Sequence, residues 1–171
     1  MDRPDRSSET AWWAGNLFLH AAAVVTSAGA LLVLGHSGAG KSTLCGLVAE
    51  QLPTLADDVV RLELRGETEG AWYVFDGRPA SAAQLRAVPL AGALRVFQAE
   101  ATSLTRATPL QTCGYLLDAV FEVVAQRHVE NGLKRAWFAC AAEVARRHPG
   151  WQLRFTKGPE TARLLCEQSW A

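Results

Sequence analysis

The sequence lacks a long apolar run and any excess of charge of one sign. No apolar stretch reaches the ~20 residues that a membrane-spanning helix requires. The 17 basic residues balance the 17 acidic residues, so the formal net charge is zero. A neutral chain has no broad basic field for a nucleic-acid backbone and no polybasic stretch for an anionic membrane. We therefore expect neither nucleic acid nor a membrane as a partner.

Paired cysteines and an export signal are lacking as well. The four cysteines lie far apart and form no C-x-x-C pair, so the sequence has neither zinc-ribbon nor thiol-redox spacing. No secretory apolar segment directly follows the polar residues 1–10, and His20 interrupts the apolar residues 17–25. These features predict a cytoplasmic protein with reduced thiols.

The chain is long enough to bury one substantial core. Its 171 residues are 49% hydrophobic and contain neither internal repeats nor low-complexity segments. We expect residues 1–10 to form a flexible N-terminal arm and residues 11–171 to form a single domain.

Apolar patterning predicts strands in the first half of the chain and helices in the second. Residues 16–25 and 30–34 should form a hairpin around a small turn, and a helix should run from 42 to 51. The other expected elements are strands at 55–64, 71–77, 92–100 and 151–155, a loop at 77–89, and helices at 109–124, 134–147 and 158–168. This order predicts an α/β fold with a mixed β-sheet flanked by helices.

Residues 31–50, LLVLGHSGAGKSTLCGLVAE, combine an apolar strand, a glycine-bearing loop and the start of a helix. Within them, GHSGAGKS at 35–42 matches the complete phosphate-loop pattern G-x-x-x-x-G-K-[ST]. The glycines allow the backbone to approach phosphates closely, and N–H groups at the helix N-terminus attract their oxygens. Lys41 should reach the β- and γ-phosphates, and Ser42 should coordinate Mg²⁺. The expected nucleotide-binding residues are Gly35, His36, Ser37, Gly38, Ala39, Gly40, Lys41, Ser42 and Thr43.

Signatures of other phosphate-loop proteins are missing. The chain has no LSGGQ-type motif and no apolar run ending in Asp-Glu, which disfavours a transporter ATPase. It also shows no cluster of arginines that would indicate the lid of a small-molecule kinase. No N-K-x-D motif selects guanine, so both ATP and GTP stay open as the nucleotide.

The pair Asp57-Asp58 is the most distinctive feature beyond the loop. It follows Lys41 by sixteen residues and lies in the strand-like residues 55–64, which we expect beside the phosphate-loop strand. Adjacent strand residues point to opposite faces, so only one carboxylate should face the nucleotide. That carboxylate could hold Mg²⁺ or accept the proton of an incoming hydroxyl. The alternative is a solvated pair at a strand end.

Residues 19–60 resemble the catalytic core of HPr serine kinase/phosphorylase, a family that shares its fold with phosphoenolpyruvate carboxykinases. His20, the phosphate loop and Ala56-Asp57-Asp58 follow one another in matching order and similar spacing. The resemblance extends diffusely over residues 17–165, where 89–121 and 150–155 are similar to small HPr-kinase-like proteins. It implies a single P-loop domain of the HPr kinase/PEP carboxykinase type that uses ATP and Mg²⁺ to phosphorylate a hydroxyl, and it favours homo-oligomers.

The same resemblance assigns roles to individual residues. It implies that His20, Lys41, Asp57 and Asp58 are catalytic, with an aspartate as the base toward the acceptor hydroxyl. It places Ser42, Asp57 and Asp58 near Mg²⁺. Taken alone, a histidine in an apolar strand such as His20 is more often a core residue with its hydrogen bonds satisfied, and the spacing shared with the family makes a role in the site equally plausible.

The sequence also departs from the HPr kinases. It contains no counterpart of their separate N-terminal domain, it has Thr43 where they commonly have Glu, and their glycine-rich phosphorylase signature is not recognisable. HPr as acceptor and phosphorylase activity are therefore in doubt, and carboxykinase chemistry is disfavoured. The acceptor stays open between a serine or threonine of a small protein or peptide and a small molecule. A non-catalytic nucleotide sensor and an ATPase subunit are the alternatives.

Two arginines are candidates for a cation near the transferring group. A positive charge there would stabilise the phosphoryl group in flight. We favour the simpler interpretation that Arg95 and Arg106 are surface residues flanking a strand, and that the six tryptophans fill the core or its edges.

Overall fold

The computed structural model describes residues 16–66, 70–78, 86–125 and 129–170. The expected N-terminal arm at 1–10 and most of the expected loop at 77–89 lie outside the described residues. Within these ranges, every helix is too short or too polar to cross a lipid bilayer.

The described residues form a mixed α/β structure, an eight-stranded mixed sheet flanked by helices, which confirms the predicted fold class. The strands are β1 (Asn16–Thr26), β2 (Gly29–Leu34), β3 (Thr54–Ala56), β4 (Val59–Arg65), β5 (Ala71–Asp76), β6 (Val88–Gln98), β7 (Ser103–Ala107) and β8 (Gly150–Phe155). The helices are α2 (Lys41–Val48), α3 (Pro109–Val124), α4 (Asn131–Arg147) and α5 (Pro159–Glu167).

The two long strands β1 and β6 each pair with different neighbours along their length. Residues 16–20 of β1 pair with β4, whereas residues 21–26 of the same strand pair with β2. Strand β6 pairs with β5 at its start and then lies parallel to both β2 and β8. Because β2 also pairs with β6, the strands β2, β1, β4, β5 and β6 form a closed ring, and β8 and β7 extend it on one side.

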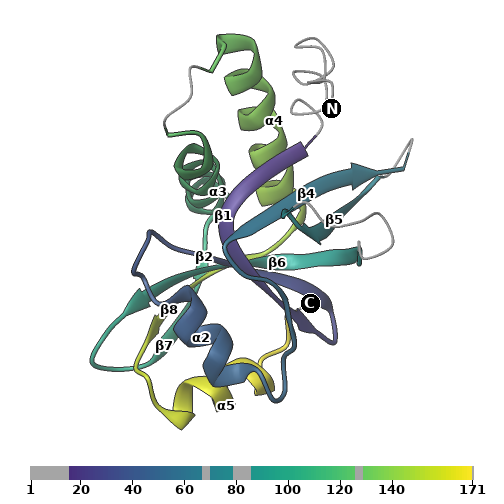
Figure 1. Cartoon of the computed structure of the whole chain (residues 1–171). Coiled ribbons are helices and arrows are strands. Elements are labelled where there is room, and N and C mark those ends of the chain that lie inside the picture. Colours follow the sequence, from purple (N-terminus) through teal and green to yellow (C-terminus); the bar gives the residue numbers. More distant parts are fainter. Residues whose placement is uncertain (1–15, 67–69, 79–85, 126–128, 171) are drawn as a thin grey trace.

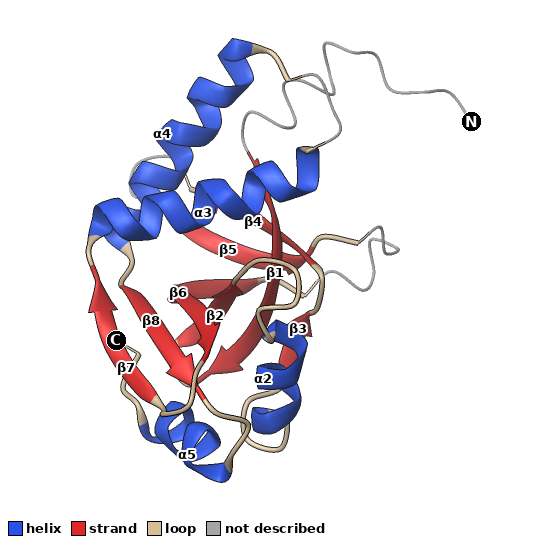
Figure 2. Ribbon diagram, turned by 90° about the vertical axis from the view of Figure 1, so that its left-hand side faces the viewer, coloured by secondary structure: helices blue, strands red, loops and turns tan. Residues whose placement is uncertain are grey.

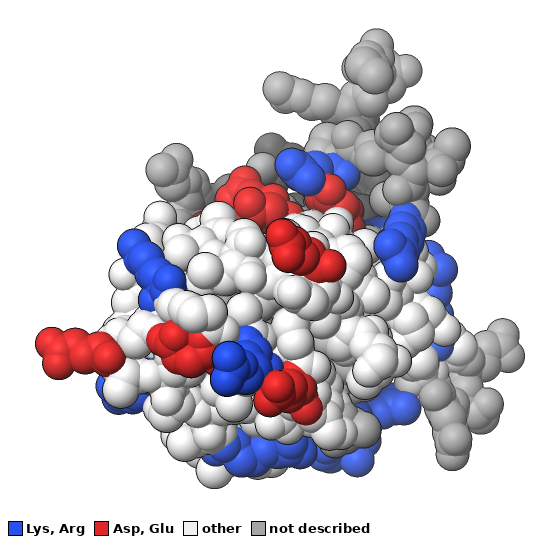
Figure 3. All heavy atoms as spheres, turned by 90° about the horizontal axis from the view of Figure 1, so that it is seen from below, with Lys and Arg blue, Asp and Glu red and all other residues white. Residues whose placement is uncertain are grey.

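Helices cover this sheet on both faces. Figures 1 and 2 show α3 and α4 on one side of the strands and α2 and α5 on the other. A hydrophobic core lies between the sheet and each pair of helices, and strand β2 contributes side chains to both cores. Ala30, Leu32 and Leu34 pack on the α3–α4 side, and Leu31 and Val33 pack on the α2–α5 side. A strand buried on both faces reads as a continuous apolar run, which explains ALLVL before the phosphate loop. On the face seen in Figure 3, charges of both signs are scattered among uncharged residues.

Helix α3 begins where the sequence predicts it. The Thr108 side chain accepts a hydrogen bond from Gln111 N, and the Thr108 backbone N–H donates one to the Gln111 side chain, with Pro109 at the first helical position. This capping box satisfies donors that a helix start leaves open. From this cap α3 runs across the sheet, and Glu122 in its last turn reaches the phosphate loop.

The prediction of one strand over 55–64 was wrong at Asp57-Asp58. Strand β3 ends at Ala56 and β4 begins at Val59, and Asp58 between them has a φ of 95°. Aspartate tolerates this left-handed conformation better than most residues do. This segment also lies beside β1 rather than beside the phosphate-loop strand β2, because β1 occupies the position between them.

Strand β7 is a second difference, because no strand was expected between residue 100 and the helix at 109–124. Four of its five side chains are exposed or half-buried, and it pairs only with β8 at the edge of the sheet. An edge strand with few buried side chains leaves little apolar periodicity in the sequence. The hairpin of β1 and β2 and the strand β8, by contrast, are confirmed.

Candidate functional site

The glycine loop joins β2 to α2 and is supported from behind by the ends of β6 and β8. Gly38 and Gly40 have φ angles of 79° and 98°, the conformations for which glycine is suited. A Cβ at Gly40 would lie 2.8 Å from the Phe155 ring and 3.2 Å from the Gln98 amide. Gln98 Nε2 donates a hydrogen bond to the Gly38 carbonyl at 3.1 Å. Sequence analysis did not identify Gln98, because no local motif marks the end of a neighbouring strand.

A pocket of about 310 Å³ opens in front of this loop. Its lining combines the loop, the start of α2, the break between β3 and β4, the middle of β1 and the end of β6: His20, Ser37, Gly38, Gly40, Lys41, Ser42, Thr43, Asp57, Asp58 and Gln98. Six of the nine residues expected to bind nucleotide are therefore in the wall. The other three are not: Gly35 is buried behind the loop, Ala39 packs against the α2–α5 core, and the His36 side chain is turned toward α3.

Lys41 lies under the loop with only 7% of its surface exposed. Its Nζ donates to the Gly35 carbonyl at 2.7 Å and to the His36 carbonyl at 3.4 Å. Burial lowers the pKa of the Lys41 ammonium from its ordinary value, and the charge of Arg95 acts in the same direction, whereas nearby carboxylates, Glu122 foremost, oppose the shift. The ammonium thus stabilises the loop backbone and lies beside the pocket.

Asp57 and Asp58 both border the pocket, so the expectation that only one of them would face it was wrong. Ser42 Oγ donates to Asp57 Oδ1 at 3.1 Å, which joins the start of α2 to the break after β3. The Ala21 N–H donates to the Asp58 carbonyl at 3.1 Å and holds that break against β1. The left-handed residue interrupts the regular alternation of strand side chains, and both carboxylates stay on the pocket side.

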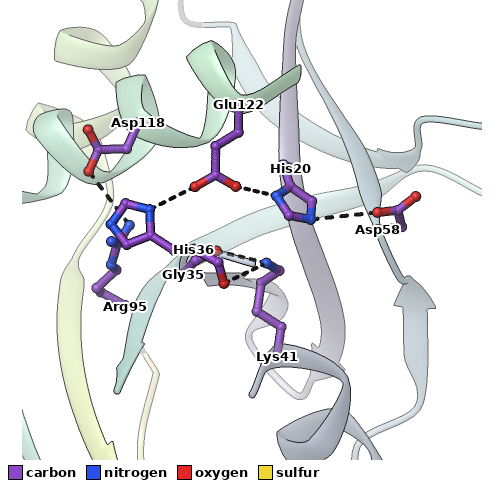
Figure 4. A network of polar contacts seen from close by, with 8 residues as sticks. All are labelled: His20, Gly35, His36, Lys41, Asp58, Arg95, Asp118 and Glu122. Carbon is purple, nitrogen blue, oxygen red and sulfur yellow. Dashed lines mark hydrogen bonds and ion pairs between the residues drawn. The ribbon is translucent and has the colours of Figure 1, made fainter. Parts of the chain in front are cut away.

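His20 on β1 lies beside the two aspartates in the lining of the pocket. Its Nε2 lies 3.6 Å from Asp58 Oδ1, and its Nδ1 contacts Glu122 Oε2 on α3 (Figure 4). The other oxygen of Glu122 lies 2.8 Å from His36 Nδ1. Partial burial acts to raise the pKa of Glu122, but hydrogen bonds from the two histidines hold it below its ordinary value. Sequence analysis missed Glu122, which has no motif around it and lies 102 positions from His20.

Arg95 is not the surface residue that its sequence suggested. Only 5% of it is exposed, its guanidinium lies over the Tyr115 ring at 5.2 Å, and its Nη1 is 3.7 Å from Asp118 (Figure 4). The apolar neighbours of β6 bury its stem, and α3 covers its head. Arg106 is exposed as expected, and it stacks on Trp151 at 4.7 Å. The tryptophans within the described ranges are buried, as expected: Trp72, Trp137, Trp151 and Trp170.

The donor set at the pocket suits a hard cation. A hydroxyl and carboxylate oxygens are the ligands that Mg²⁺ prefers, and Mg²⁺ commonly takes only one or two carboxylates together with phosphate and water. Ser42 and Asp57 provide such a pair, and Asp58 lies next to them. Within the described ranges, no three side chains of His, Cys, Asp or Glu gather as a metal-binding group.

Comparison with protein-family models and with curated proteins finds no match. The chemistry of the pocket is therefore the basis for inferring a function, since a fold alone does not define one.

Proposed function

We propose that this protein is an ATP- and Mg²⁺-dependent kinase that transfers the γ-phosphoryl group to a hydroxyl, on a P-loop fold of the HPr kinase/PEP carboxykinase type. One observation carries the proposal: the glycine loop, Ser42 and both aspartates border the same pocket. Phosphoryl transfer requires little more than a phosphate cradle, a metal site and a carboxylate near the acceptor. ATP and GTP both suit the cradle.

The loop and its neighbours would bind the triphosphate. Backbone N–H groups of residues 37–42 would bind the phosphates at the start of α2, and the Lys41 ammonium beneath the loop would add positive charge. Ser42 and Asp57 would hold Mg²⁺, which neutralises charge on the β- and γ-phosphates. The hydrogen bond between these two side chains already places both oxygens at one spot.

Asp58 is then the better candidate for the base. The Asp58 side chain is 72% exposed, so an acceptor can approach it from solvent. The hydroxyl of Ser42 donates to Asp57 and leaves the carboxylate of Asp58 available. In the proposed step the acceptor O–H gives its proton to an Asp58 oxygen, and the acceptor oxygen forms a bond to the γ-phosphorus. The bond between that phosphorus and the β–γ bridging oxygen breaks, and ADP leaves with its electron pair. The acceptor is a serine or threonine of a small protein or peptide, or a small molecule.

A nucleotide sensor is the second candidate, because the loop, Lys41 and Ser42 line the pocket whether or not a neighbouring aspartate acts as a base. A protein that only binds nucleotide and changes shape needs this loop but no base. The two candidates therefore differ at Asp58.

The test separates binding from transfer. Nucleotide affinity is measured by calorimetry with Mg²⁺, and transfer is measured with γ-labelled ATP on a low-molecular-weight lysate fraction, together with ADP release. Asp58→Asn should leave affinity nearly unchanged and lower transfer by about 10²–10⁴-fold, the usual contribution of a general base. Glu143→Gln on α4, a surface carboxylate paired with Arg146, is the control and should change neither quantity.

Three outcomes are distinguishable. Loss of transfer in Asp58→Asn with intact binding supports the kinase. A wild-type protein that binds nucleotide but neither labels an acceptor nor releases ADP favours the sensor. A wild-type protein that binds no nucleotide refutes both.

A further inference from the structure

Glu122 bridges two histidines that come from different elements. One carboxylate oxygen contacts Nδ1 of His20 on β1, and the other lies 2.8 Å from Nδ1 of His36 in the glycine loop. The carboxylate is 27% exposed and the His20 side chain 23%, so both are largely shielded from water. Figure 4 shows the resulting chain of contacts from Asp58 through His20 and Glu122 to His36.

These contacts determine where the imidazole hydrogens lie. An ionised carboxylate only accepts hydrogen bonds, so each histidine must present an N–H to Glu122 from its Nδ1. The other nitrogen of His20, Nε2, is then the one that faces Asp58 and the pocket. Without Glu122, nothing in the described contacts of His20 would select this orientation of its hydrogens.

The backbone pairing of β1 explains why His20 lies between Asp58 and Glu122. His20 pairs with Val59 in the β1–β4 ladder, and the adjacent Ala21 N–H donates to the Asp58 carbonyl. The strand therefore presents His20 beside the break between β3 and β4. Helix α3 brings Glu122 to the opposite side of the ring.

We infer that Glu122 is a positioning residue of the phosphate-binding site: it holds His20 with Nδ1–H turned to α3 and Nε2 to the pocket, and it fixes the outer side of the glycine loop through His36. A carboxylate that orients an imidazole in this way is a common device of enzyme sites and metal sites. The consequence for nucleotide binding rests on the proposed function, whereas the orientation of His20 does not.

A merely stabilising ion pair is the competing explanation. Partly exposed ion pairs contribute little to stability, so a structural role would appear only as a small change in unfolding. Positioning, by contrast, changes which nitrogen of His20 carries hydrogen. That property has its own spectroscopic signature.

The first experiment reads the imidazole nitrogens directly. The ¹⁵N chemical shifts of the histidines are recorded on the full chain without nucleotide at about pH 8, above the ordinary imidazole pKa. The His20 and His36 signals are assigned with His20→Gln and His36→Gln. Wild-type His20 should carry hydrogen on Nδ1, and Glu122→Ala should shift it toward a mixture of tautomers. Glu143→Gln, which removes an exposed carboxylate paired with Arg146 on α4, is the control and should leave the His20 signals unchanged.

Two results would overturn the inference. One is a His20 Nδ1 without hydrogen in the wild type, and the other is a His20 signal that Glu122→Ala leaves unchanged. If Glu122→Ala does not fold, Glu122→Gln decides: its amide replaces one carboxylate oxygen with an NH2 donor, so it can accept from only one of the two histidines, which face different oxygens of Glu122. Both imidazoles keeping their Nδ1–H in that variant would equally overturn the proposal.

The second experiment tests the connection to the loop. ATP affinity with Mg²⁺ is measured for His36→Ala, Glu122→Ala and the double variant. Each single variant should weaken binding by about tenfold, the size of one charged hydrogen bond, and the double variant should weaken it no further. Fully multiplicative losses would refute the connection through His36. A wild type that binds no ATP would refute the proposed function, and the His20 signals would still decide the role of Glu122.

Discussion

A graded series of alanine substitutions at three glycines tests the geometry of the loop. Gly40 has a φ of 98° and lies against the Phe155 ring, which is itself only 1% exposed and cannot move aside. The left-handed conformation costs an alanine about 1–2 kcal/mol. Forcing a methyl group 2.8 Å from the ring adds about 1–3 kcal/mol of overpacking. Gly40→Ala should therefore lower the free energy of unfolding by about 2–5 kcal/mol.

The other two glycines separate these contributions. Gly38 has a φ of 79°, but no described atom lies within 4 Å of the position that its Cβ would take, so Gly38→Ala should lose only the conformational part, about 1–2 kcal/mol. Gly46 is exposed in the middle of α2 with open space around it, and Gly46→Ala should stabilise the protein by about 0.5–1 kcal/mol. Urea unfolding at a constant m-value measures all three. Equal losses at Gly38 and Gly40 would refute the close contact between the loop and β8.

Three further predictions concern the site, a helix cap and pH. Ser42→Ala should weaken nucleotide binding by about tenfold with Mg²⁺ and hardly at all with a chelator, because the lost hydroxyl serves the metal and Asp57; calorimetry with and without Mg²⁺ measures the difference. Thr108→Ala should lower the free energy of unfolding by about 1 kcal/mol through loss of the cap on Gln111 N, without changing nucleotide affinity. Lys41 has a pKa below 10.5 in the folded state, so the unfolded chain binds more protons between the two values and stability rises with pH there. Urea midpoints should accordingly rise with pH in the wild type relative to Lys41→Met as the pH approaches 10.5.

The phosphate loop was predictable because its conformation depends on neighbours in the sequence. Glycines at 38 and 40 allow the positive φ angles, and an apolar strand before the loop and a helix after it need no distant residue to be recognised. The same is true of the hairpin before the loop and of the Thr108 cap. Each is specified within about ten residues.

The rest of the site depends on residues that are distant in the sequence, and it was not predictable for that reason. Gln98 and Glu122 contact the loop, and Arg95 is buried between β6 and α3, only because β6 lies parallel to β2 and α3 packs on the sheet. Glutamate in an amphipathic helix and arginine in a strand are ordinarily surface residues. Only the packing of the helix on the sheet turns Glu122 toward His36 and covers the Arg95 guanidinium.

The error at Asp57-Asp58 has a physical cause that bears on function. The register of β1 is the same on both sides of the break, since Ala23 pairs with Ala56 and His20 pairs with Val59. No residue is inserted, so the apolar pattern of 55–64 looks like one strand. What interrupts it is the left-handed backbone of Asp58, a conformation that costs free energy and is commonly found where a site requires it. Asp58→Gly should therefore stabilise this backbone while removing the carboxylate, and Asp58→Ala should destabilise the protein by about 1–2 kcal/mol relative to Asp58→Gly. If urea unfolding finds the two variants equally stable, Asp58 does not hold this conformation, and the argument that places both carboxylates on the pocket side fails with it.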